Sequence, residues 1–132
     1  MKRDMDLIRE LLLKLEAFSL TPAGVLIFQP NSPEIAVPGH DVASTYYNID
    51  LMYQAGFMNN RVNSRPGMGF SFCGLSWKGH EFLDSVRDPA IWRATKEGAA
   101  KAGGLSVDLL GALAKGLIKT QIEKHTGVSL DL

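Results

Sequence analysis

Cysteine is nearly absent from this chain. Cys73 is its only one, so no disulfide can form within a single molecule. A lone cysteine is typical of a reducing compartment. Net charge is absent as well, because 14 Lys and Arg residues balance 14 Asp and Glu residues. A strongly basic tail or domain is therefore excluded as the basis of binding.

Long hydrophobic runs are also missing. No segment approaches the roughly 20 apolar residues that a membrane-spanning helix needs. Charged residues at positions 2, 3, 4 and 6 make the start of the chain unlike a signal peptide. We therefore expect a cytoplasmic protein without a membrane partner. The 132 residues, 45% of them hydrophobic, are enough for one domain with its own core.

Apolar residues recur with the period of a helix in several segments. The clearest is 4–18, whose single apolar stripe consists of Ile8, Leu11, Leu12, Leu15 and Phe18. Further helices are predicted at 41–55, 77–87, 89–101 and 107–124. Asp41, Ser76 and Ser106 precede three of these as N-cap residues do, and Pro89 suits a first helical turn.

Other segments are predicted to be extended. Four prolines between residues 19 and 40 exclude a long helix there, and 24–28 and 34–37 are candidate short strands. Residues 57–63 and 68–75 predict a β-hairpin, because Pro66-Gly67 suits the centre of a type II turn. The element order predicts an α+β fold, with a winged-helix-like domain over 1–88 and a helical C-terminal extension over 89–132.

Three segments carry a resemblance to a known family. They are MKRDMDLIR at 1–9, YNIDLMYQAGFM at 47–58, and LSWKGHEFLDSVRD at 75–88, which Ile91-Trp92 follows. Nearly from end to end, the chain resembles the bacterial and prophage family called domain of unknown function 2513. The resemblance implies a small winged-helix-like protein of mobile elements or phage-related loci, with no assigned activity. Asn48 and Asp50 stand where the family often has His and Lys, which weakens a DNA-contact role for that helix.

Motifs for catalysis or metal binding are incomplete. In HEFLD, at 80–84, an aspartate stands where a zinc helix of the H-E-x-x-H type has its second histidine. Ser76 lacks the glycine two positions later that a nucleophile elbow requires, and no cationic neighbour activates Cys73. We therefore predict no enzyme, no cofactor and no metal. A polar network on one helix face is predicted instead, made by His80, Asp84 and Arg87.

Nucleic-acid binding is the main functional prediction. In a winged helix, one helix enters the major groove while the wing touches the phosphate backbone. Arg61 and Arg65 flank the predicted hairpin turn, in a stretch without acidic residues. The helix 41–55 has no Lys or Arg, and its candidates for contact are Tyr47 and Asn48, with Lys78 beyond it.

Two functional hypotheses follow from these residues. The first is a DNA-binding or transcription-regulatory module acting on double-stranded DNA. The alternative is a protein–protein interaction or oligomerisation module without DNA binding, such as a phage-locus accessory or antagonist factor. Zero net charge and the absence of cations from helix 41–55 favour the alternative.

The last predicted helix carries an apolar stripe that needs a partner surface. The stripe consists of Leu110, Leu113, Leu117 and Ile118. Small residues beside it permit close approach of another helix, and Gly103-Gly104 separates it from the helix before. We predict a homodimer through this helix. The alternative is that it folds back on the helices of Trp77 and Trp92, two tryptophans expected to pack between the core and the extension.

Overall fold

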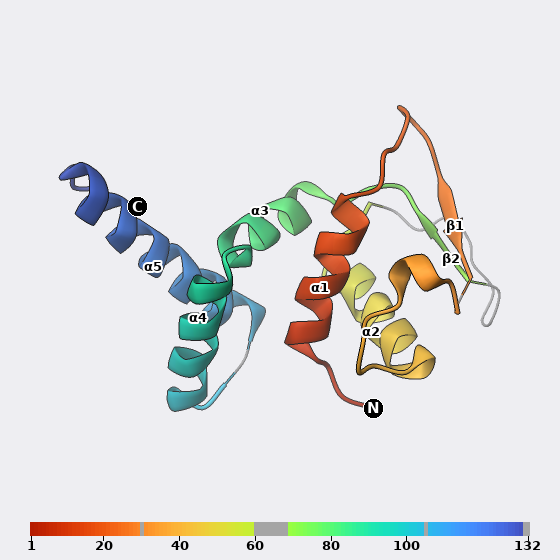
Figure 1. The fold of residues 1–132 in the computed structure, drawn as a ribbon, viewed down its shortest axis with the longest axis horizontal. Coiled ribbons are helices and arrows are strands. Elements are labelled where there is room, and N and C mark those ends of the chain that lie inside the picture. Colours follow the sequence, from red (N-terminus) through yellow and green to blue (C-terminus); the bar gives the residue numbers. More distant parts are fainter. Residues whose placement is uncertain (30, 60–68, 105, 131–132) are drawn as a thin grey trace. The chain divides into compact units, whose positions relative to one another are not determined.

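The computed structural model describes residues 1–29, 31–59, 69–104 and 106–130. It is an α+β protein that divides into two compact units, Met1–Leu83 and Asp84–Leu132. Its described residues form five α-helices, one short 3₁₀ helix and a two-stranded antiparallel sheet, shown in Figure 1.

Two capped helices form the α-helical part of the first unit's core. α1 (Met5–Glu16) packs against α2 (Val42–Gln54) and against the 3₁₀ helix η1 (Pro33–Ile35). Asp4 begins α1 by accepting the backbone N–H of Leu7 at 3.1 Å, and Asp41 begins α2 by accepting that of Ser44 at 2.7 Å. Both predicted helices are confirmed, because caps and apolar spacing define them locally.

The sheet joins segments that are far apart in the sequence. β1 (Leu26–Phe28) pairs antiparallel with β2 (Phe70–Phe72), in a register that places Phe28 opposite Phe70. The rings of this aromatic pair lie 5.3 Å apart between centroids. Beyond β2, Met58 forms an isolated antiparallel bridge with Leu75. Aromatic burial on the inner face therefore stabilises the sheet against the helices.

One prediction for the extended segments is wrong, and the hairpin prediction is confirmed in part. Residues 34–37 are not a strand, because η1 occupies Pro33–Ile35; proline at its first position fixes φ near a helical value. β2 also pairs with β1, which the hairpin prediction of 57–63 with 68–75 did not include. The described ends of that hairpin do pair antiparallel, because Met58 bridges Leu75 and the Asn59 N–H donates to the Gly74 carbonyl oxygen at 2.9 Å. Residues 60–68, with the predicted turn, lie outside the described residues.

The third helix starts in the first unit. α3 (Trp77–Val86) begins at Ser76, whose hydroxyl oxygen accepts the N–H of Gly79 at 3.0 Å. The same hydroxyl donates to the carbonyl oxygen of Gly56. The predicted cap is confirmed, and its second hydrogen bond links α3 to the chain that follows α2.

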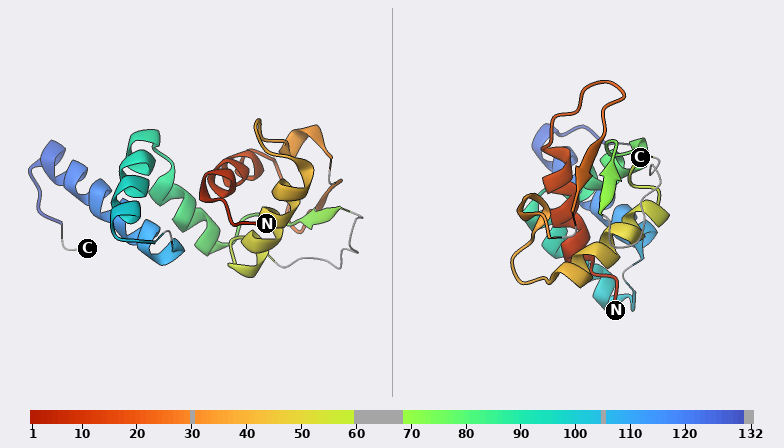
Figure 2. Two further views of the ribbon diagram at one scale, coloured as in Figure 1. Left: turned by 90° about the horizontal axis from the view of Figure 1, so that it is seen from below. Right: turned by 90° about the vertical axis from the view of Figure 1, so that its right-hand side faces the viewer.

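The second unit is built on two helices in contact. α4 (Pro89–Lys101) is capped by Asp88, and α5 (Val107–Thr126) by Ser106, while Gly127 in the left-handed region ends α5. Both helices were predicted from the sequence. Figures 1 and 2 show α4 crossing the first half of α5, while the second half of α5 continues beyond it.

Candidate functional site

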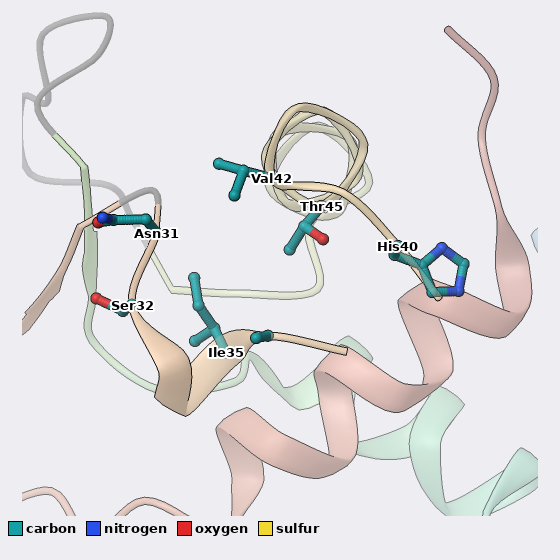
Figure 3. A pocket seen from close by; sticks show the side chains of 7 residues that line it. Asn31, Ser32, Ile35, His40, Val42 and Thr45 are labelled. Atoms are coloured by element: carbon teal, nitrogen blue, oxygen red, sulfur yellow. The ribbon is translucent and has the colours of Figure 1, made fainter. Parts of the chain in front are cut away.

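A small pocket lies between η1 and the start of α2. Figure 3 shows Ile35 and Thr45 on its walls and His40 at one end. Its volume is about 40 Å³, which is room for little more than a water molecule. Small-molecule sites usually measure roughly 300–1,000 Å³. The pocket is therefore too small for a nucleotide or a cofactor of similar size.

Asn48 is a structural residue, which corrects its prediction as a contact residue. Its side chain is fully buried. The Oδ1 atom accepts the backbone N–H of Asp4 at 2.8 Å, and Nδ2 donates to the carbonyl oxygen of Ser44 at 2.9 Å. A second, longer bond of 3.5 Å runs from Nδ2 to the Lys2 carbonyl oxygen. Asn48 thus holds the start of α1 against α2 and cannot reach a partner.

The outer face of α2 is poor in positive charge. Tyr47 is 37% exposed and can contact a partner. Asp50 accepts a hydrogen bond from Gln54 at 2.7 Å on the same helix, and Asp41 adds a second carboxylate at the helix start. No Lys or Arg lies between residues 41 and 55. This face therefore lacks the cations that bind phosphates.

The first residue of α3, Trp77, is the most exposed large hydrophobic residue among those described in the first unit. Trp77 is 82% exposed, and Lys78 beside it is exposed as well. The prediction that Trp77 packs between the core and the C-terminal extension is wrong, whereas Trp92 is buried, with 4% of its surface exposed. Trp77 and the buried Val86 lie on opposite sides of the axis of α3, so Trp77 is on the solvent side of the helix. Arg61 and Arg65 lie outside the described residues.

The polar residues of α3 contact separate carboxylates. Asp84 and Arg87 pair at 2.8 Å, as the network predicted, but the His80 ring lies 3.9 Å from the carboxylate of Glu16 on α1. Cys73 is half-buried. No group of three or more potential metal-binding side chains is found among the described residues. The described residues therefore do not form a metal-binding site.

The predicted interface stripe of α5 divides between two environments. Leu110 is fully buried in its own chain, and Leu113 lies against α4, where a β-carbon built at Gly98 would be 3.7 Å from its Cδ1. Leu110 is therefore not an interface residue, which corrects that part of the prediction. Leu117 and Ile118 are only half-buried. The contact between α4 and α5 matches the alternative that α5 folds back on the helix of Trp92.

Comparison with known proteins identifies the family. The family described as "Hypothetical protein (DUF2513)" matches residues 2–106. The chain belongs to the DUF2513 family. The resemblance noted in the sequence is thereby confirmed. An uncharacterised protein of Haemophilus influenzae (strain ATCC 51907 / DSM 11121 / KW20 / Rd) is 32% identical over 124 residues, which cover 92% of this chain and 99% of that protein. No solved structure matches the chain.

The C-terminal end of the DUF2513 match coincides with the start of a helix. It includes the first unit and α4, and it ends at residue 106, directly before α5 starts at Val107. Trp77 and Lys78 lie inside the matched region, whereas the α5 stripe lies beyond it. Among the described residues of this DUF2513 protein, none of the helices has the length and apolar character needed to cross a membrane.

Proposed function

We propose that this protein is a non-enzymatic interaction module that binds another protein through the surface around Trp77. The observation that carries the proposal is the exposure of Trp77, 82%, at the first residue of a helix fixed by the Ser76 cap. A tryptophan offers a large apolar area to a partner, and tryptophan is enriched among residues that dominate binding energy. Lys78 supplies a charged neighbour at the rim.

The proposed scaffold is a winged-helix-like domain. Helix, strand, short helix and helix are followed by the antiparallel Met58–Leu75 bridge and by β2, which returns to β1. This order supports the assignment of 57–75 as a wing beside the sheet. The proposed domain boundary remains at residue 88, with the helical extension after it.

A photo-cross-linking experiment tests the role of Trp77. p-Benzoyl-phenylalanine at position 77 is expected to cross-link a discrete partner in the native host. The same probe at the exposed Glu34 of η1, on a different element of the first unit, serves as the control. Identical products from both positions would contradict the proposal. Trp77→Ala is expected to leave the unfolding temperature unchanged, because the side chain is exposed, and so to isolate binding from folding.

DNA binding is the second candidate, in which the protein acts as a transcription-regulatory module. The strand arrangement supports it, together with the exposure of Tyr47 and Lys78. Arg61 and Arg65 remain the proposed phosphate contacts of the wing. A gel shift with random duplex at low salt tests it, and replacing both arginines by Ala is expected to reduce the salt slope by about two. Absence of any shift at low salt would exclude this candidate.

Self-association through α5 and a cytoplasmic location are also proposed. Half-buried Leu117 and Ile118, with Ile122 at 40% exposure, support the homodimer. Sedimentation equilibrium of the wild-type protein tests it, and a monomer at all concentrations would contradict it. Leu113→Lys is a poor variant for this purpose, because Leu113 lies against Gly98 of α4 in the same chain.

A further inference from the structure

α5 carries two apolar faces, only one of which is used inside the chain. Leu110 and Ala114, fully buried, mark the face that packs within the second unit. The adjacent face carries Val107, Gly111, Ile118 and Ile122, whose spacings of four, seven and four residues place them on one side of a helix. Ile122 is 40% exposed. The exposed Lys115 lies at the edge of this second face, between Gly111 and Ile118, and the other side chains of the face are apolar and partly open to a partner.

Gly111 marks a gap on that face. Apart from the helix's own backbone, no atom of the described residues lies within 4 Å of a β-carbon built there. Glycine inside a helix costs roughly 0.5–1 kcal/mol relative to alanine. Here the space beside the glycine is open, so a side chain of another molecule can approach the helix backbone. The gap lies near the start of α5, and the exposed Ile122 lies near its end.

The lengths of the helices leave about a third of α5 beyond the reach of α4. α5 has 20 residues and α4 has 13, which correspond to about 30 Å and about 20 Å. Figure 2 shows the second half of α5 extending past α4. Ile122 belongs to the part of α5 that extends past α4, and Ile118, one turn before it, is half-buried.

The charges at the two ends of α5 favour an antiparallel second copy as the occupant. Asp108 lies in its first turn, and Lys124 and His125 lie in its last turn. An antiparallel partner brings the acidic start of each helix beside the basic end of the other, and it also opposes the two helix dipoles. A parallel partner would place like charges side by side. One register places Ile122 opposite Gly111 of the second copy and Asp108 level with His125.

We infer that α5 packs antiparallel against α5 of a second copy, with Ile122 of each protomer seated over Gly111 of the other. The inference rests on the self-association proposed above and names its surface and geometry. The symmetry is isologous, so each contact occurs twice about the dyad. Leu110 and the α4 contact stay inside each protomer.

Cysteine cross-linking tests the arrangement directly. Cys73→Ser removes the only native thiol. In that background the double variant Gly111→Cys, Ile122→Cys is expected to form a covalent dimer under mild oxidation, whereas either single variant does not. The two positions lie about 16 Å apart along one helix, which is too far for an internal disulfide. Efficient cross-linking of Ile122→Cys alone would overturn the antiparallel geometry.

Sedimentation equilibrium distinguishes a failure of the antiparallel geometry from a failure of the self-association on which it rests. A dimer that forms but gives no cross-link with the double variant would overturn the geometry and leave self-association standing. A wild-type protein that is monomeric at every concentration would overturn both. Ile122→Glu is expected to weaken the dimer at least tenfold. Thr120→Glu, at an exposed position on the opposite side of α5, is the matched control and should leave it unchanged.

Discussion

The backbone of Gly79 in α3 lies directly against the carbonyl oxygen of Phe57. A β-carbon built at Gly79 would be 2.0 Å from that oxygen and 2.9 Å from the carbonyl carbon. Such distances are impossible without moving the backbone. The start of α3 therefore packs on the segment after α2 through a contact that only glycine permits, beside the Ser76 cap that fixes the same turn.

Gly79→Ala is therefore expected to destabilise the protein by about 2–3 kcal/mol, because the chain must shift to admit a methyl group. Gly98→Ala in α4 is the matched control. Its β-carbon would meet Leu113 at an ordinary 3.7 Å, so the gain in helix propensity should raise stability by about 0.5–1 kcal/mol. Urea unfolding followed by circular dichroism measures both. Equal effects of the two changes would contradict the close contact.

Ser76→Ala is expected to cost about 1 kcal/mol through loss of the N-cap. The hydroxyl both accepts the Gly79 N–H and donates to Gly56, so no second group replaces it in these two bonds. Ser76→Thr, which retains the hydroxyl, should recover most of the loss. Denaturant midpoints compare the three proteins, and a Thr variant as unstable as the Ala variant would count against the cap.

Asn48→Ala is expected to lower the free energy of unfolding by about 2 kcal/mol, because it leaves the Asp4 N–H without its partner in a part-buried position. Asn59→Ala is the control of the same residue type. Asn59 is exposed and donates one bond, of 3.1 Å, to the Cys73 carbonyl oxygen, so its loss should cost less than about 0.5 kcal/mol. Thermal unfolding distinguishes the two, and a neutral Asn48→Ala would contradict its structural role.

Ala23→Gly is expected to stabilise the protein by up to about 1 kcal/mol. Ala23 has φ 59° in a turn closed by a 2.8 Å bond from Gly24 N–H to the Thr21 carbonyl oxygen, and a left-handed conformation costs an alanine roughly 1–2 kcal/mol. Ala94→Gly, at an exposed helical position in α4, should destabilise by roughly 0.5–1 kcal/mol. Unfolding midpoints that fall for both variants would show that the turn is unstrained.

The helices were predictable because their signals are local. Asp41 and Ser76 each accept a hydrogen bond from the backbone N–H three residues later, and the spacing of the apolar residues indicates which side of each helix is buried. The β1–β2 pairing was not predictable in this way. Phe28 pairs with Phe70, 42 positions later in the sequence, and no local turn fixes that register.

The site was less predictable than the fold, for physical reasons. Asn48 was assigned to the surface because its amide can contact a base, but it shares the inward side of α2 with Ile49 and Met52. A polar residue in an apolar stripe was the available signal that it is a buried hydrogen-bonding group. Trp77 lies opposite Val86 on α3, so the helical period alone would have placed it in solvent.

The hydrogen bond from the Asp4 N–H to Asn48 constrains when the chain can fold during synthesis. α1 leaves the ribosome first, yet the side chain that secures its start lies 44 residues later. β1 must likewise wait for β2, which ends at Phe72. A nascent chain that stops before residue 72 therefore holds an exposed apolar helix with no finished sheet. The first unit closes only after nearly all of its own sequence has emerged, which makes its folding late and cooperative rather than progressive.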